Sequence, residues 1–281
     1  MPHDLHAILN SPLSGNALSK ENALRLSAIE GPDVFDLFSA ANKLRAAFRG
    51  DLIDLCSITS AKTGDCPEDC SYCAQSRRSK TMVESHPLKS KDFMLERARA
   101  AKAQGARRSC IVISGKKASS SELKKIADMI KSVREAGLLP CATLGLLGRD
   151  ELLMLKDAGL ERYHHNIETS RRFFPEICST HTYDDKLKTI DAVKSVGLSL
   201  CSGGIFGMGE EWEDRIDMAM TLRELGADSV PINFLVPIKG TPLEGIEPLS
   251  PLEALKTISL YRFILPDKEV RVCGGRFHRG R

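Results

Sequence analysis

The stretch Cys66-Pro67-Glu68-Asp69-Cys70-Ser71-Tyr72-Cys73 places three thiols in the pattern C-x3-C-x2-C. The two short spacers allow three sulfurs to converge on one small inorganic group, and thiolates are the usual ligands of zinc and of iron-sulfur clusters. A structural zinc site is closed by four ligands, whereas a cubane cluster held by three cysteines leaves one iron open to another molecule. The pattern therefore favours a catalytic iron-sulfur site, with three reduced cysteines in an ordinary loop as the alternative.

The longer run from Lys62 to Ser76, KTGDCPEDCSYCAQS, resembles the biotin synthase family of radical S-adenosyl-L-methionine (SAM) enzymes. An aromatic residue directly before the third cysteine, here Tyr72, belongs to the superfamily signature. The resemblance implies that Cys66, Cys70 and Cys73 ligate a 4Fe-4S cluster whose free iron chelates SAM. It also implies that Tyr72 belongs to the cofactor site and that reductive cleavage of SAM starts the chemistry.

Composition is typical of a soluble protein, with 42% hydrophobic and 27% charged residues in a chain of 281. We expect a cytoplasmic protein without a membrane partner, because no apolar run is long enough to span a bilayer and the first ten residues do not form a leader peptide. The net charge of +3 is too small to imply a nucleic-acid partner. Nine cysteines without a secretion signal indicate reduced thiols that serve as ligands or core residues.

From residue 52 onward, apolar segments of strand length alternate with amphipathic helices, which favours a TIM-like β/α barrel over a doubly wound sheet. Residues 1–50 are expected to form a helical extension that covers one end of a barrel at 51–276. The predicted strands are Leu52–Thr59, Arg108–Ser114, Leu139–Leu144, Arg162–Ile167, Leu198–Ile205, Ser229–Phe234 and Val270–Cys273. The predicted helices lie near Lys91–Gln104, Ser121–Glu135, Asp150–Ala158, Tyr183–Ser195, Glu211–Leu225 and Pro251–Phe263.

These patterns supply seven strands, one fewer than a closed eight-stranded barrel requires. The resemblance to the family ends at Arg276, and residues 277–281 form a short basic tail. We therefore expect a barrel that is incomplete at its C-terminus, followed by a divergent or truncated tail at 277–281.

Three more cysteines, Cys110, Cys141 and Cys201, fall within three different predicted strands. Side chains alternate along a strand, and barrel strands point every second one inward, so these thiols could meet in the lumen. Taken singly, each thiol could instead be a small buried core residue.

The family resemblance implies that Cys110, Cys141 and Cys201 ligate an auxiliary 2Fe-2S cluster that supplies sulfur, with Arg271 as its unusual fourth ligand. The chain departs from the family pattern at Cys273, which lies two residues beyond Arg271 and would share its face of an extended strand. A thiolate at Cys273 could displace Arg271 and permit a four-iron auxiliary cluster. Both the fourth ligand and the number of irons stay open at this point.

Further site residues follow only from the resemblance. It implies that Asn166 and Glu168 contact the ribose of SAM, with Glu168 replacing a family aspartate, and that Ile205 and Phe206 flank the adenine. Asn166 and Asn233 would contact the substrate. Four residues without a matching role are interpreted as packing or structural residues: Cys56, Cys178, His164 and His165.

The resemblance implies sulfur insertion that converts dethiobiotin to biotin, in a homodimer reduced by a flavodoxin- or ferredoxin-type protein. Three alternatives remain. Another radical SAM barrel enzyme, such as a hydrogenase maturase or a methylornithine synthase, would keep the first loop without the full second set. A non-catalytic iron-sulfur redox protein would not cleave SAM, and an impaired fragment would be inactive.

Overall fold

A computed structural model describes residues 3–275, so the tail predicted at 277–281 lies outside the described residues. Eight strands form one parallel sheet in which neighbours follow the order β1-β2-β3-β4-β5-β7, with β6 and β8 both paired to β7. The strands are β1 (Cys56–Lys62), β2 (Arg108–Ile113), β3 (Leu139–Thr143), β4 (Arg162–His164), β5 (Ser199–Cys201), β6 (Gly204–Phe206), β7 (Ser229–Phe234) and β8 (Glu269–Val272).

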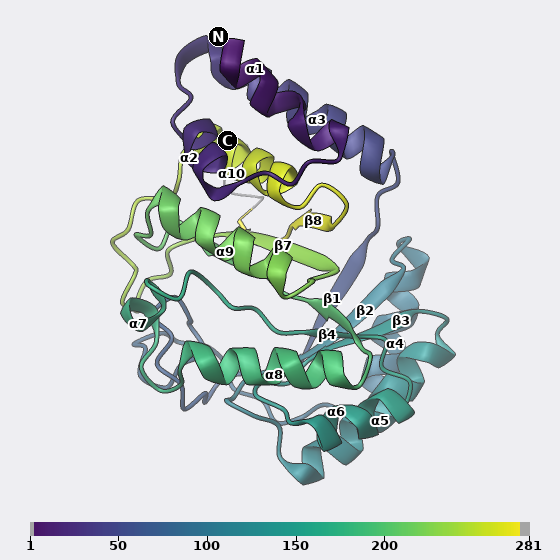
Figure 1. Cartoon of the computed structure of the whole chain (residues 1–281). Coiled ribbons are helices and arrows are strands. Elements are labelled where there is room, and N and C mark those ends of the chain that lie inside the picture. Colours follow the sequence, from purple (N-terminus) through teal and green to yellow (C-terminus); the bar gives the residue numbers. More distant parts are fainter. Residues whose placement is uncertain (1–2, 276–281) are drawn as a thin grey trace.

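Helices alternate with the strands and lie on the outside of the curled sheet (Figure 1). They are α4 (Lys91–Ala103), α5 (Ser120–Glu135), α6 (Arg149–Asp157), α7 (Phe174–Ile177), α8 (Tyr183–Ser195), α9 (Trp212–Glu224) and α10 (Pro251–Ile264). Several begin at a side-chain oxygen that accepts a hydrogen bond from the third helical residue, which satisfies an otherwise unpaired amide. These residues are Ser90, Ser119, Thr182 and Ser250. Within the described residues, no helix has both the length and the apolar character needed to cross a membrane.

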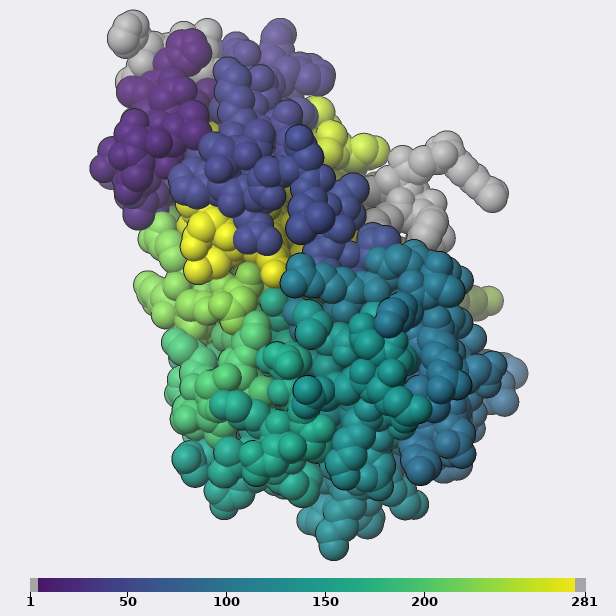
Figure 2. Space-filling view, turned by 90° about the vertical axis from the view of Figure 1, so that its right-hand side faces the viewer, coloured from purple at the N-terminus to yellow at the C-terminus, as the bar shows by residue number. Residues whose placement is uncertain are grey.

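The N-terminal region is helical, as predicted, and consists of α1 (His3–Asn10), α2 (Lys20–Ser27) and α3 (Val34–Arg49). Helix α3 packs on α10, and α2 packs on α9 and α10. The first and last parts of the described chain therefore lie side by side at one end of the molecule, as the purple and yellow segments show (Figure 2).

The predicted α/β barrel is confirmed as a curled parallel sheet covered by helices, but the predicted bounds of three strands are wrong. Strand β4 ends at His164 instead of Ile167, and the division of one predicted strand gives eight strands instead of seven. Strand β1 begins at Cys56 instead of Leu52, because the preceding residues leave the sheet and expose Leu52 and Ile53 to 78% and 79%. The predicted strand Leu198–Ile205 is two strands, β5 and β6, that are interrupted at residues 202–203.

The interruption between β5 and β6 follows from close backbone packing. A β-carbon on Gly203 would lie 2.1 Å from the Pro231 carbonyl oxygen, and one on Gly204 would lie 2.2 Å from the Glu168 carbonyl oxygen. Only glycine allows the chain to pass between these two backbones.

The sheet has an open seam between its two outermost strands. In the described part of the chain, β1 pairs with β2 and β8 pairs with β7, and β1 and β8 are not paired with each other. A hydrogen bond from Nη2 of Arg271 to the carbonyl oxygen of Asp54, at 3.3 Å, spans this seam.

We expect Gly204→Ala to lower the free energy of unfolding by about 1–3 kcal/mol, because the added methyl group must displace the Glu168 backbone. Urea denaturation followed by circular dichroism measures this change. Gly245→Ala is the matched control, since a β-carbon at Gly245 meets no atom within 4 Å. Equal losses in the two variants would contradict the close approach at Gly204.

Candidate metal centres

The loop at residues 66–73, called the outer loop below, follows the carboxyl end of β1 and is folded by its own backbone. The Cys66 amide donates to the Gln75 carbonyl at 3.0 Å, and the Cys73 amide donates to the Cys70 carbonyl at 3.0 Å. The Ser76 hydroxyl donates to the Glu68 carbonyl at 2.5 Å. These bonds hold all three half-buried thiols on one compact turn, which suits a shared inorganic ligand.

Asp69 anchors the outer loop to the segment after α7. Its carboxylate accepts hydrogen bonds from the Ser179 amide at 3.0 Å, the Thr180 amide at 3.2 Å and the Thr180 hydroxyl at 2.9 Å. Burial alone would raise the pKa of Asp69, but the bonds from Ser179 and Thr180 hold this pKa well below its ordinary value. The carboxylate is therefore ionised when the loop is docked.

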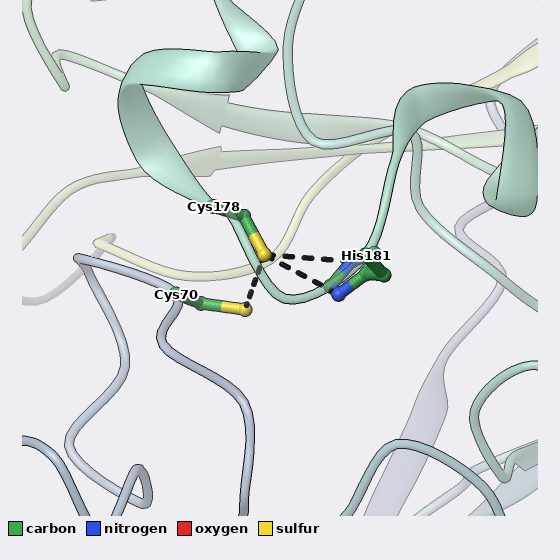
Figure 3. A group of neighbouring side chains, drawn as sticks. All are labelled: Cys70, Cys178 and His181. Atoms are coloured by element: carbon green, nitrogen blue, oxygen red, sulfur yellow. Dashed lines mark hydrogen bonds between the residues drawn. The ribbon is translucent and has the colours of Figure 1, made fainter.

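A fourth thiol lies against the outer loop (Figure 3). The Cys178 sulfur is 3.9 Å from the Cys70 sulfur and 3.3 Å from Nδ1 of His181. His181 in turn pairs with the Glu68 carboxylate. Contact with Cys70 and with His181 lowers the pKa of Cys178 to about 4, and contact with Cys178 raises the pKa of Cys70. Sequence spacing gave no sign of this contact, because Cys178 is 108 residues beyond Cys70.

A row of polar side chains runs from the end of β4 toward the outer loop. Nε2 of His164 lies 2.7 Å from Oδ1 of Asn166, whose Nδ2 donates to Glu168 at 3.3 Å. Glu168 has a φ of 72° and pairs with Lys186 at 3.6 Å. Burial raises the pKa of Tyr72, and the charge of the Glu168 carboxylate raises it further. His164 contributes to this row, although the sequence suggested only a packing role.

A cavity of about 700 Å³ occupies the opposite end of the lumen, and five thiols line it: Cys56, Cys110, Cys141, Cys201 and Cys273. Cys110 and Cys141 are direct partners across β2 and β3, so both point to the same face of the sheet. Contact with Cys110, together with burial, raises the pKa of Cys141, and burial raises the pKa of Cys201. The structure thus brings the three strand cysteines and Cys273 into one space, which is called the inner cavity below.

Cationic side chains dominate the lining of the inner cavity. They are Arg45, Arg49, Arg108, Arg162, Arg262 and Arg271, against the acidic Asp51, Asp54 and Glu269. Among the described residues, the buried Nε and Nη1 of Arg108 have no hydrogen-bond partner. A buried donor without a partner is costly, so these atoms suit an anionic ligand such as a thiolate-bound cluster with its sulfides. The inner cavity therefore fits an iron-sulfur cluster.

The two candidate fourth ligands, Arg271 and Cys273, differ in how they are held. Arg271 donates to the Asp54 carbonyl and lies 3.8 Å from the Glu269 carboxylate. Burial alone would lower the pKa of Arg271, but the Cys56, Cys201 and Cys273 thiols raise it above its ordinary value. Cys273 follows β8, and its amide donates to the Ile232 carbonyl at 2.9 Å.

The remaining predicted site residues lie between the two thiol sets or behind them. Asn233 lines the inner cavity, donates to the Gly204 carbonyl at 3.0 Å and accepts from the Gly274 amide at 2.9 Å. Ile205 is half-buried on β6. The Phe206 ring is 1% exposed and packs against Phe234 and Tyr261 in the core, so it lies away from the lumen.

Two family models match the chain. One is described as the radical SAM superfamily and matches residues 61–222, and the other is described as the biotin and thiamin synthesis associated domain and matches residues 231–280. The biotin synthase of Thermodesulfovibrio yellowstonii is 54% identical over 243 residues, which cover 86% of this chain and 77% of that protein. The biotin synthase of Heliobacterium modesticaldum is 48% identical over 264 residues, which cover 94% and 81%.

Solved structures agree on the fold. The crystal structure of a methylornithine synthase superposes with a TM-score of 0.84 at 22% identity, over 94% of this chain and 78% of that one. At this identity the likeness shows a shared barrel architecture and does not extend to the reaction.

We expect Asp69→Asn to lower the free energy of unfolding at pH 7 by about 1–2 kcal/mol, because hydrogen bonds to a charged acceptor are stronger than those to an amide. A depressed pKa stabilises the fold above the unfolded value of about 4 and loses this effect as the pH falls through the folded value. The difference between the two proteins should therefore shrink below about pH 4. Urea titrations at a series of pH values measure it, and a pH-independent difference would contradict the role of the Asp69 charge.

Proposed function

Because the chain belongs to the biotin synthase family of the radical SAM superfamily and is an enzyme of sulfur insertion, we propose that it converts dethiobiotin to biotin in the lumen of its barrel. The observation that carries this proposal is the placement of two thiol sets at opposite ends of one lumen. The outer loop follows the carboxyl end of β1, whereas Cys56 begins that strand and Cys110 and Cys141 are the third residues of β2 and β3. Cys201 ends the three-residue β5 but pairs with Ser229, the first residue of β7. The seven-residue length of β1 separates the two ends by about 20 Å.

This arrangement suits the chemistry of an unactivated carbon. Saturated C–H bonds resist acid and base catalysis, so a cofactor must carry the difficult step while the protein binds, orients and excludes water. When bound, SAM at a 4Fe-4S cluster supplies the radical that removes hydrogen, and an auxiliary iron-sulfur cluster supplies the sulfur. A substrate held between the two ends of the lumen would lie within reach of both groups.

The residues of the outer end have separate tasks in this proposal. Cys66, Cys70 and Cys73 would hold the first cluster. Tyr72, Glu168 and Asn166 would contribute to the SAM site, where the carboxylate of Glu168 can accept hydrogen bonds from the ribose hydroxyls. Ile205 offers an apolar surface to the adenine, whereas Phe206 contributes through its neighbours in the core.

Asn166 and Asn233 are the proposed substrate contacts. An amide side chain can donate and accept at once, which matches the paired N–H and C=O groups of a cyclic urea. Both carboxamides are already oriented by the protein, Asn166 by the Gly203 amide at 3.1 Å and Asn233 by Gly204 and Gly274. Preorganised groups of this kind fix the position of a substrate at low entropic cost.

For the auxiliary cluster we propose Cys110, Cys141, Cys201 and, as the fourth ligand, Cys273. The guanidinium of Arg271 is engaged by Asp54 and Glu269 and stays protonated, which leaves no lone pair for iron. A thiolate is the usual ligand of iron in such clusters. Four thiolates would also suit a four-iron cluster in place of a 2Fe-2S cluster.

Three further proposals concern the cellular setting. The reductive cleavage of SAM takes up an electron, which we assign to a flavodoxin- or ferredoxin-type donor. We also propose that the protein is cytoplasmic and that it forms a homodimer, as the family resemblance implies.

Anaerobic reconstitution with iron and sulfide, followed by incubation with SAM, reductant and dethiobiotin, tests the proposed reaction. Formation of biotin is expected, and SAM cleavage without biotin would overturn the substrate assignment.

We expect the reconstituted protein to hold two separable clusters, one lost in Cys70→Ala and the other in Cys141→Ala, because the two thiols belong to different ends of the lumen. Iron and sulfide analysis with Mössbauer spectroscopy measures what each variant retains. Ser121→Ala, on the exposed surface of α5 and distant in sequence from both thiol sets, is the control and should keep both clusters. Loss of all cluster signal in either alanine variant, in protein that is still folded by circular dichroism, would contradict two independent sites.

We expect Cys273→Ser to change the Mössbauer parameters of the auxiliary cluster and Arg271→Lys to leave them nearly unchanged, because the ligand atom is replaced only in the first variant. Cys141→Ala gives the reference signal for an absent auxiliary cluster. The reverse result, with a change only in Arg271→Lys, would identify Arg271 as the ligand.

A further inference from the structure

Cys56 is the thiol of the inner cavity that has no part in the ligand sets proposed above. It is the first residue of β1 and pairs in register with Arg108, while Ile58, two residues on, pairs with Cys110. Partners across parallel strands point to the same face, and so do residues two apart on one strand. Cys56 therefore points into the lumen with Cys110. A purely structural role for Cys56 does not explain this orientation.

The electrostatic surroundings of Cys56 are those of the cluster site. The charged or ionisable groups that act on it are Cys141, Arg271, Arg108 and Cys273. Cys141 in turn contacts Cys110 and acts on Cys201. Burial raises the pKa of Cys56 to about 11, and the two guanidinium groups act in the opposite direction without offsetting it. The thiol lines the inner cavity together with the three strand cysteines and Cys273, so a thiophilic metal would have to displace its proton.

Cys56 also occupies a distinct position in the sheet. Each of the other inner thiols lies on β2, β3, β5 or directly after β8, whereas Cys56 is on β1, across the open seam from Cys273. A metal group bound by both would connect the two outermost strands, which are not paired with each other in the described residues.

We propose that Cys56 is a metal-binding thiolate of the inner cavity, so that this site offers iron five sulfur donors from five strands or strand ends. Iron in such clusters is tetrahedral and takes four ligands. Resting on the proposed function, a fifth thiol would keep the site occupied after a sulfide has left with the product: the Cys56 thiol would give its proton to water in the open cavity, and its sulfur would hold the iron in place of that sulfide. This ligand replacement by itself leaves the iron and the Cys56 sulfur in their oxidation states.

The first test uses the unsubstituted chain and Cd²⁺, a thiophilic ion that requires neither sulfide nor SAM. Residue-resolved mass spectrometry follows the alkylation of Cys56 by iodoacetamide with and without Cd²⁺. The cavity is open beside residues 50–55, so the reagent can reach the thiol. We expect Cd²⁺ to slow the alkylation of Cys56 at least about tenfold, because the thiolate is the nucleophile and a metal-bound thiolate is blocked.

The control for this labelling is Ser121→Cys on the exposed surface of α5, whose alkylation rate should not change with Cd²⁺. Equal rates for Cys56 with and without Cd²⁺, while Cys110 and Cys141 are protected, would overturn the proposal. Because no turnover is measured, this outcome would leave the assignment of the reaction untouched.

A second test measures Co²⁺ affinity by its thiolate absorption in two variants that both carry Cys70→Ala, which removes the outer site. One variant also carries Cys273→Ser, and the other carries Cys273→Ser with Cys56→Ser. The first keeps four inner thiols and the second keeps three, so we expect the affinity to fall at least about tenfold between them. Equal affinities, in proteins with equal melting temperatures, would show that Cys56 is not a ligand.

Discussion

The parallel register of β2 and β3 is the constraint on which the inner site depends. Cys110 and Cys141 face each other as direct partners, and the same alternation places Arg162 opposite Cys141 and Cys201 opposite His164. A shift of one residue in any of these pairs would move a thiol from the lumen to the helix-covered face. The set of thiols that lines the cavity therefore depends on the register of the sheet.

The outer site depends on a different kind of order. Its three cysteines lie on a loop, where the ladder of a sheet cannot fix them, and the loop is held instead by hydrogen bonds to Asp69 and by the contact of Cys70 with Cys178. The segment at 178–181, which follows α7, thus supports the loop. Loops that carry function on a rigid scaffold commonly need such a second anchor.

Much of this arrangement follows from the sequence, and the exceptions have physical reasons. Local patterns in the sequence predicted the alternation of strands and helices and the three cysteines of the outer loop. The break between β5 and β6 was not, since it results from the approach of Gly203 and Gly204 to backbones far away in the chain. The positions of Cys56, Cys178 and His164 beside the candidate centres were also missed, because contacts between distant segments leave no periodic signal.

The ion pair between Arg162 and Glu269 affects whether the inner cavity keeps its shape when it is empty. Arg162 is on β4 and Glu269 on β8, with two strands of the sheet between them, and the guanidinium holds the carboxylate through two hydrogen bonds of 2.7 and 3.3 Å. The pair therefore spans the lumen itself at the amino ends of the strands. Since both groups are protein side chains, the width of the lumen at this level does not depend on an inorganic occupant, and an emptied centre can be rebuilt in a space that has kept its shape.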